Sequence, residues 1–167
     1  RSARHAGQGL YEQARVIDDT VSGLFDQEAL ASGILAEFDL ATGRLRYLNA
    51  GHPQPHVLRS GRVVKTLTDG QRGLFGLGSG ELTIAEEILQ PEDWLVLHTD
   101  GVTEARDHTG EFFGDKRLVD FLEREAASGH APPETVRRLV HAVMNHQGGV
   151  LQDDATVLLA RWTKKRV

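Results

Sequence analysis

The sequence predicts one α+β domain that spans residues 1–167. Three observations lead to this fold class. Apolar residues recur at helical spacing near the N-terminus, whereas residues 33–88 consist of short apolar runs separated by turn residues. Two amphipathic segments and a final apolar run follow. Strands followed by two helices and a last strand, without an internal repeat or a linker, are typical of a single α+β domain.

The first predicted element is a helix over residues 3–25. Its apolar side chains fall on one helical face, at Leu10, Ala14, Ile17, Val21 and Leu24. The sequence opens at Arg1 inside this helix and has no initiator methionine. We therefore expect a fragment of a longer protein, with proteolytic processing as an alternative origin of the same start.

Antiparallel strands are expected next, because turn residues separate the apolar runs. Gly43 can supply the positive φ of a tight hairpin turn, and Ser60-Gly61 is expected to form a second one. A further strand should end before Pro91, since proline cannot donate to a ladder. The strands predicted in this stretch cover residues 34–40, 44–49, 56–59, 62–67 and 81–89.

An apolar run over residues 94–97 predicts the central strand, because such a run is typical of burial on both faces. Two amphipathic helices should follow on either side of Pro132-Pro133, since proline suits a first helical turn. Residues 155–162 form the last predicted strand. The run GLFGLGSG lacks the Lys-Ser/Thr of a phosphate-binding loop, and we interpret it as a flexible connection.

The composition excludes several classes of function. No apolar run approaches the roughly 20 residues of a membrane span, and the N-terminus lacks a signal peptide, which predicts a cytoplasmic protein. The net charge of −5 argues against nucleic acid as a partner. Because the chain has no cysteine, any metal site must use oxygen or imidazole ligands.

The most informative stretch is Leu97-His98-Thr99-Asp100-Gly101, where an apolar strand runs into an aspartate. An ionised carboxylate buried at a strand end needs a metal ion, an arginine or several N–H donors, since leaving it unpaired costs several kcal/mol. Gly101 lets the backbone turn closely beside it. The alternative is an aspartate that caps the turn or the following helix.

A second stretch, Asp153-Asp154, stands directly before the last predicted strand. Side chains alternate along an extended chain, so one of the two carboxylates can face a shared site while the other faces away. The alternative is an acidic surface loop. Strand-end aspartates from separate parts of a sheet assemble oxygen-lined Mg²⁺ or Mn²⁺ sites, so together with Asp100 these residues predict such a site.

Histidines give no comparable signal. His98, His108, His141 and His146 show no shared metal-ligand spacing. His52 stands in Asn49-Ala50-Gly51-His52-Pro53, a strand that ends in small residues and a proline turn, and we expect it to act as a turn or hydrogen-bonding residue.

Three stretches carry a family resemblance: YLNAGHPQPHVLR, DWLVLHTDGVTEARD and QDDATVLLARW, in this order, with FGLG between the first two. The sequence resembles the PPM-type (protein phosphatase 2C-like) metal-dependent serine/threonine phosphatases of the bacterial stage II sporulation protein E and sigma-factor-regulator class. The resemblance covers nearly the whole chain.

The resemblance implies an α-β-β-α sandwich, in which two antiparallel sheets flanked by helices hold a two-metal site at one edge. It matches Asp100 and Asp153 to metal ligands and Gly101 to the glycine after the first aspartate, with Asp154 the weaker candidate ligand. The implied activity is hydrolysis of phosphoserine or phosphothreonine on a regulatory partner, such as an anti-sigma-factor antagonist, by a water that Mn²⁺ or Mg²⁺ activates. No side chain acts as nucleophile.

The sequence departs from the family at its start, where we find neither the strand with Gly-Asp nor the Asp-x-x-Gly-His-Gly motif. We expect this chain alone to bind metal weakly and to be inactive. The alternative function is a non-catalytic regulatory module that binds a protein partner. A Ca²⁺-binding domain is a third interpretation, but the closely spaced acidic loop of such sites is absent from the sequence. Loss of neighbouring strands would expose a sheet edge, which predicts a homodimer.

Overall fold

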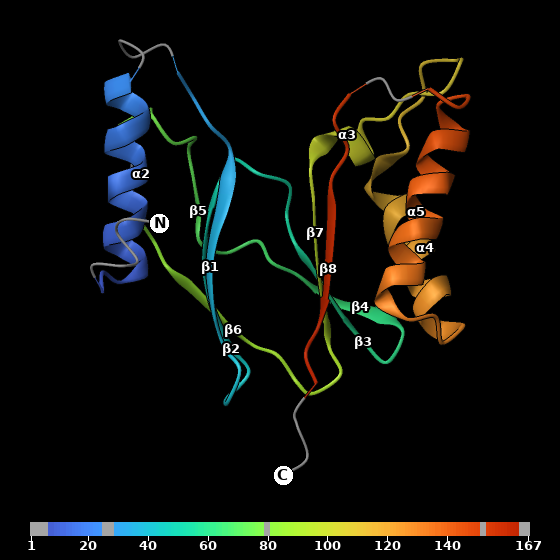
Figure 1. Ribbon diagram of the computed structural model, residues 1–167, viewed down its shortest axis with the longest axis horizontal. Helices are drawn as coiled ribbons and strands as arrows, with labels where there is room; N and C mark the ends of the chain where they lie inside the picture. The colour runs from blue at the N-terminus through green and yellow to red at the C-terminus, as the bar shows by residue number, and fades with distance from the viewer. Residues whose placement is uncertain (1–6, 25–28, 79–80, 151–152, 164–167) are drawn as a thin grey trace. The chain divides into compact units, whose positions relative to one another are not determined.

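The computed structural model describes residues 7–24, 29–78, 81–150 and 153–163 (Figure 1). The chain divides into two compact units. Unit 1 comprises residues 1–52 and 68–89, and unit 2 comprises residues 53–67 and 90–167. Each unit combines one sheet with at least one helix, so the α+β class is confirmed.

Unit 1 is a four-stranded sheet with one helix, α2 (Leu10–Leu24), along one of its faces (Figure 1). Strand β2 is its centre, because it pairs with all three of the others. The pairing with β1 and β6 is antiparallel, and the short pairing with β5 is parallel. The strands are β1 (Gly33–Asp39), β2 (Arg44–Ala50), β5 (Gln71–Arg72) and β6 (Ala85–Ile88).

The expected N-terminal helix is confirmed for Leu10–Leu24, and Leu10 and Ala14 are buried as its periodicity predicts. The helix does not continue back through Gly7, whose φ of 72° lies in the left-handed region. Residues 1–6 and 25–28 lie outside the described part. Asp18 fixes the helix to the rest of unit 1, since it accepts hydrogen bonds from Arg72 Nη2 (3.0 Å) and the Gly76 N–H (2.7 Å).

The first hairpin forms as predicted, with Gly43 at φ 80° in the turn. Asp39 holds this turn, because its carboxylate accepts hydrogen bonds from the Thr42 hydroxyl (2.7 Å) and the Ala41 N–H (2.8 Å). These bonds, first that from Thr42, lower the pKa of Asp39. The strand expected over residues 81–89 is shorter, Ala85–Ile88.

Residues 73–78 of the glycine-rich run, which we expected to be a flexible connection, pack around Phe75, and residues 79–80 lie outside the described part. Phe75 and Ala31 exchange two backbone hydrogen bonds of 2.9 and 3.0 Å. The phenyl ring is buried against Ala14, Leu48 and Ala50. Burial of one aromatic side chain thus outweighs the backbone freedom of the glycines around it.

Unit 2 is a sheet in the order β4-β3-β7-β8, and Figure 1 shows α4 and α5 on one face of it. The strands are β3 (His56–Arg59), β4 (Arg62–Thr66), β7 (Trp94–His98) and β8 (Val157–Arg161). The helices are α3 (Asp100–Thr103), α4 (Gly114–Ala127) and α5 (Pro132–His146). The second predicted hairpin is confirmed in β3 and β4, with Ser60 (φ 49°) and Gly61 (φ 78°) in its turn.

Strand β7 is central, as predicted, because it lies between β3 and β8. Trp94 and Val96 are buried, but Leu95 and Leu97 are only half-buried. The predicted burial on both faces is thus complete on the helix side and partial on the other. The core on the helix side joins Val96 to Leu118, Leu122 and Leu139.

Among the described residues, no helix has the length and apolar character needed to cross a membrane.

Candidate metal centre

Strands β7 and β8 bring the two acidic stretches together, although Asp100 and Asp153 are 53 positions apart (153 − 100). The strands are antiparallel, and their ladder reaches His98 opposite Val157. Thr99 extends it by one step, since its N–H donates to the Thr156 carbonyl (3.0 Å) and its hydroxyl accepts from the Thr156 N–H (2.9 Å). The turn after β7 therefore lies beside the turn before β8.

Gly101 packs against the backbone of the second stretch. It is buried, and a Cβ at this position would lie 2.4 Å from the Asp154 carbonyl oxygen and 3.4 Å from Ala155 Cα. A glycine is thus needed for the two turns to approach this closely. The Thr99 hydroxyl also donates to the Asp154 carbonyl (3.3 Å).

Asp100 begins α3, and its Oδ1 accepts a hydrogen bond from the Gly101 N–H (2.9 Å). The residue is exposed, so the prediction of a buried carboxylate at this strand end is wrong. The reason is local: the chain turns at Thr99, before the aspartate, and the side chain leaves the core. The capping alternative is not realised for α3, since its N-cap residue is Thr99 and no side chain caps the helix.

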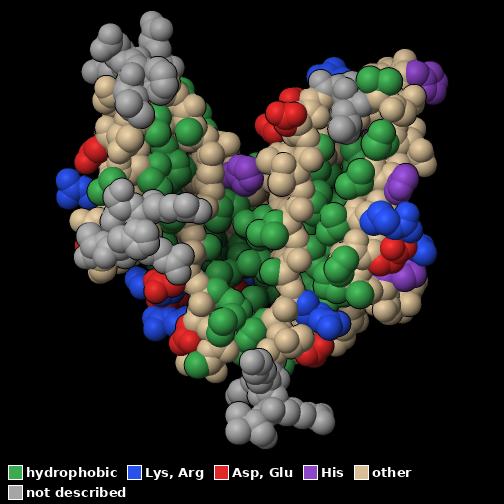
Figure 2. All heavy atoms as spheres, viewed as in Figure 1, with side chains coloured by type: hydrophobic (Ala, Val, Ile, Leu, Met, Phe, Trp, Pro, Cys, Tyr) green, Lys and Arg blue, Asp and Glu red, His purple; other side chains and the backbone are tan. Residues whose placement is uncertain are grey.

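Asp153 and Asp154 are exposed as well. Asp153 Oδ1 accepts a hydrogen bond from the Asp154 N–H (2.7 Å). Figure 2 shows acidic side chains gathered at this end of unit 2. Within the described ranges, no lysine or arginine forms an ion pair with Asp100, Asp153 or Asp154.

This donor set fits a hard cation. Carboxylate oxygens are the ligands that Mg²⁺ and Mn²⁺ prefer, and two neighbouring turns carry these three carboxylates without a protein cation to neutralise them, although their oxygens do not all lie within 4.8 Å of one another. Each carboxylate has acceptor capacity beyond the one backbone hydrogen bond that Asp100 and Asp153 make.

His52 forms a corner of unit 1, in keeping with the turn role expected from the sequence. Its N–H donates to Asn49 Oδ1 (2.8 Å), and Asn49 Nδ2 donates to the His52 carbonyl (2.9 Å). This reciprocal pair closes the turn after β2 and uses backbone groups that would otherwise need water.

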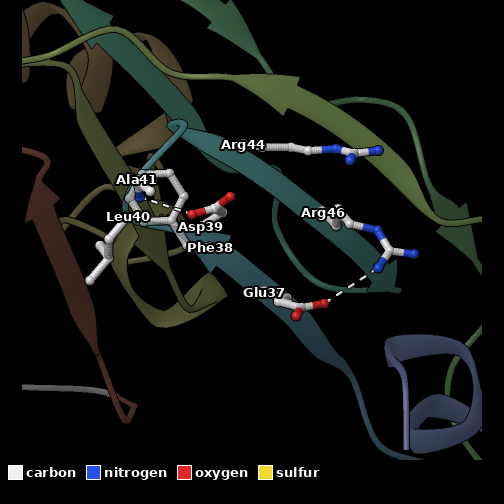
Figure 3. Close-up of a pocket in the computed structure, with 7 residues that line it drawn as sticks. All are labelled: Glu37, Phe38, Asp39, Leu40, Ala41, Arg44 and Arg46. Carbon is white, nitrogen blue, oxygen red and sulfur yellow. Dashed lines mark hydrogen bonds and ion pairs between the residues drawn. The ribbon is translucent and has the colours of Figure 1, made fainter.

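A hollow lies elsewhere in unit 1, at the end of the β1–β2 hairpin. It has a volume of about 560 Å³ and is lined by Glu37, Asp39, Arg44 and Arg46, among others. Figure 3 shows Arg46 turned toward Glu37. Arg44 donates to Glu86 (3.0 Å), and this hydrogen bond raises the pKa of Arg44. Because both guanidinium groups are already paired with carboxylates, the hollow offers weak attraction for an anion.

One group of potential metal ligands was missed by sequence reasoning. His56, His98 and Asp115 meet on the helix side of the unit 2 sheet. They share no spacing in the sequence, because three separate elements carry them. The sequence signal that could have found this group is His56, a histidine that begins the otherwise largely apolar strand His56–Arg59.

Comparisons with known proteins identify the fold as that of a protein phosphatase 2C-type domain. The family model for stage II sporulation protein E matches residues 1–163. The chain belongs to this family, whose phosphatases are metal-dependent.

Individual relatives cover most of the chain. Protein IcfG of Synechocystis sp. is 30% identical over 135 residues, which are 81% of this chain and 21% of that protein. The SiaA-PP2C domain of Pseudomonas aeruginosa has 25% identity and a TM-score of 0.73, covering 91% of this chain and 58% of the solved one. A solved chain with RsbU and RsbW domains, from Mycobacterium tuberculosis, has a TM-score of 0.75 at 21% identity, covering 99% of this chain and 46% of its own length. The chain thus spans about a fifth of the curated relative and about half of these solved chains.

Proposed function

We propose that this chain supplies part of a Mn²⁺ or Mg²⁺ centre that hydrolyses phosphoserine and phosphothreonine on a regulatory protein. The close packing of Gly101 on the Asp154 backbone carries the proposal, because it places two acidic turns side by side at one end of β7 and β8. Such ions, when bound, polarise a phosphoryl group and activate water.

Each residue has a distinct role in this proposal. Asp100 and Asp153 bind the ions through carboxylate oxygens that their backbone hydrogen bonds hold in place. Gly101 permits the close approach of the two turns. Asp154 is a weaker candidate ligand, since neighbouring residues on an extended chain face opposite sides. No side chain needs to act as a nucleophile.

The proposed partner is a cytoplasmic phosphoprotein, such as an anti-sigma-factor antagonist. Membership in the stage II sporulation protein E family supports this class of partner, as does the fold likeness to a solved chain that joins RsbU and RsbW domains. The acidic net charge makes nucleic acid a poor alternative.

A second candidate function is a non-catalytic module that binds a regulatory protein. The observation that favours it is that the oxygens of Asp100, Asp153 and Asp154 do not form a group with all ligand atoms within 4.8 Å of one another.

Mn²⁺ binding to the 167-residue chain, measured by calorimetry, tests the proposed centre. We expect weak binding that Asp100→Asn and Asp153→Asn each reduce by about ten-fold or more, and that Asp154→Asn reduces less. Asp120→Asn is the control, since Asp120 is an acidic residue on helix α4 that pairs with Lys116. If all these variants bind Mn²⁺ with equal affinity, these aspartates are not metal ligands and the proposed centre is wrong.

Turnover separates the two candidate functions. A phosphoserine peptide is offered to the natural protein that contains this chain, with Mn²⁺ present. Hydrolysis that Asp100→Asn abolishes supports the phosphatase. Metal binding without hydrolysis, in a protein that still binds its phosphoprotein partner, supports the regulatory module.

A further inference from the structure

A second group of metal-type ligands lies inside unit 2, built from residues other than the acidic turns. His56 is the first residue of β3, His98 is the last residue of β7, and Asp115 lies in the first turn of α4. One ligand atom from each residue lies within 4.8 Å of the other two. We propose that these three residues bind a divalent transition-metal ion of the Zn²⁺ type.

The strand register explains why the two histidines meet. His56 pairs with Val96 across the antiparallel β3–β7 ladder. His98 follows Val96 by two residues, so its side chain lies on the same face of the sheet and is the diagonal neighbour of His56. The two rings are stacked, with centroids 6.0 Å apart and an angle of 14° between their planes. This is the face that α4 covers, and Val96 packs there against residues of that helix.

Both rings are held through Nδ1. His98 Nδ1 lies 3.1 Å from the Thr99 carbonyl oxygen, and His56 Nδ1 lies 3.1 Å from Thr66 Oγ1. A carbonyl oxygen can only accept, so His98 Nδ1 carries the proton of the neutral ring and Nε2 carries the lone pair. Metal-binding histidines are typically oriented in this way, with the non-ligating nitrogen hydrogen-bonded to a carbonyl or another polar group.

Asp115 completes the group and opens it to solvent. Its Oδ1 lies 3.1 Å from His56 Nε2, while its side chain is 64% exposed. The histidines are 1% and 4% exposed. An ion could therefore enter beside the aspartate and reach two ligands that are shielded from water.

The ligand types select the class of ion. Two imidazole nitrogens and one carboxylate suit Zn²⁺ and similar ions, whereas Mg²⁺ and Ca²⁺ prefer oxygen ligands alone. Bonds of about 2.0–2.2 Å to the ion place tetrahedral ligand atoms roughly 3.3 Å apart. The pair His56–Asp115 already has this spacing. Asp115 is exposed at the start of a helix, and a movement of its side chain can adjust the spacing between its carboxylate and His98.

Zn²⁺ titration of the metal-stripped 167-residue chain tests the proposal. Asp100→Asn and Asp153→Asn are first combined as a background, so that zinc bound by the acidic turns does not contribute. We expect one Zn²⁺ per chain in this background by calorimetry, and an affinity at least about ten-fold weaker after Asp115→Asn is added. The matched control is Asp120→Asn, on the same helix and also paired at the surface.

Two outcomes overturn the proposal. One is the absence of zinc binding in the background variant. The other is an Asp115→Asn variant that binds zinc as tightly as the Asp120→Asn control. Either result would leave His56 and Asp115 as a structural hydrogen-bonded pair.

Ring signals and thermal unfolding give two independent readouts that do not require substitution of a buried histidine. Saturating Zn²⁺ should shift the imidazole NMR signals of both His56 and His98. It should also raise the unfolding temperature of the background and of the Asp120→Asn control, and raise that of Asp115→Asn less, because an ion that binds only the folded state stabilises it in proportion to its affinity. Unchanged imidazole signals at saturation would contradict the assignment of these ligands.

Discussion

Gly101 lies directly against Asp154: a Cβ on Gly101 would be 2.4 Å from the Asp154 carbonyl oxygen. The neighbouring atoms are backbone, so a side chain could not be accommodated by a rotamer change. The backbone of Gly101 is outside the left-handed region, and steric exclusion is therefore the reason that glycine is needed here.

Gly101→Ala should destabilise the chain by about 1–3 kcal/mol, because it inserts a methyl group into a close backbone contact. It should also weaken Mn²⁺ binding, since the two acidic turns must separate. Chemical denaturation and calorimetry measure the two effects. Gly23→Ala is the control: Gly23 lies in helix α2 with nothing within 4 Å of its added Cβ, so it should be neutral or slightly stabilising. Equal stability of both variants would contradict the contact.

Thr99→Val should loosen the same pair of turns without adding bulk. The Thr99 hydroxyl accepts from the Thr156 N–H and donates to the Asp154 carbonyl, and valine can do neither. We expect a loss of about 1 kcal/mol in unfolding free energy and a lower Mn²⁺ affinity. Thr99→Ser keeps the hydroxyl and should restore both. A serine variant as impaired as the valine variant would show that the methyl group, not the hydroxyl, matters.

Asp93 should be important for the stability of unit 2. Its carboxylate is 1% exposed and accepts hydrogen bonds from Arg59 Nε (2.9 Å), Arg59 Nη2 (2.7 Å) and the Gln90 N–H (2.7 Å). Asp93→Ala should cost about 2–3 kcal/mol by urea denaturation, somewhat less than a fully buried pair because Arg59 is one-third exposed. Glu86→Gln, which breaks the exposed pair with Arg44, should cost less than about 1 kcal/mol. Similar costs for the two variants would refute this ranking.

The loop after α3 should depend on an ionised Asp107. Hydrogen bonds from the Thr109 side chain and then from the Glu111 and Thr109 N–H groups lower the pKa of Asp107 to about 2, from 3.8. A lowered folded-state pKa means that the stabilisation is present above pH 3.8 and is lost as the pH falls through about 2. An NMR titration of the Asp107 carboxyl carbon should show its midpoint near pH 2. A midpoint at the ordinary value would contradict these hydrogen bonds.

Strand β8 should promote self-association. It is an edge strand of its sheet in the described part of the chain, and Leu158 on it is 58% exposed. Edge strands with exposed apolar side chains can pair with another chain. Light scattering over a dilution series should show a dimer that Leu158→Lys weakens, while Val140→Lys, at an exposed apolar position on helix α5, should not. A monomer at all concentrations would rule out the homodimer.

Local sequence patterns predicted most elements, because helical and strand periodicity depend on neighbouring residues. The helix at Leu10–Leu24, the hairpin with Gly43 at its turn and the two helices around Pro132 needed no long-range information. The acidic stretches at Asp100 and Asp153 were also visible, since carboxylates at strand ends are unusual enough to be noticed in a linear sequence.

Tertiary contacts decided what those patterns left open. The exposure of Asp100, the order around Phe75 and the contact of Gly101 with Asp154 all depend on which distant segments pack together. The group of His56, His98 and Asp115 depends on the β3–β7 register and on the placement of α4. Sequence periodicity determines which face of an element is apolar, but the register between elements determines which polar groups meet, and that register is set by the packing of the whole unit.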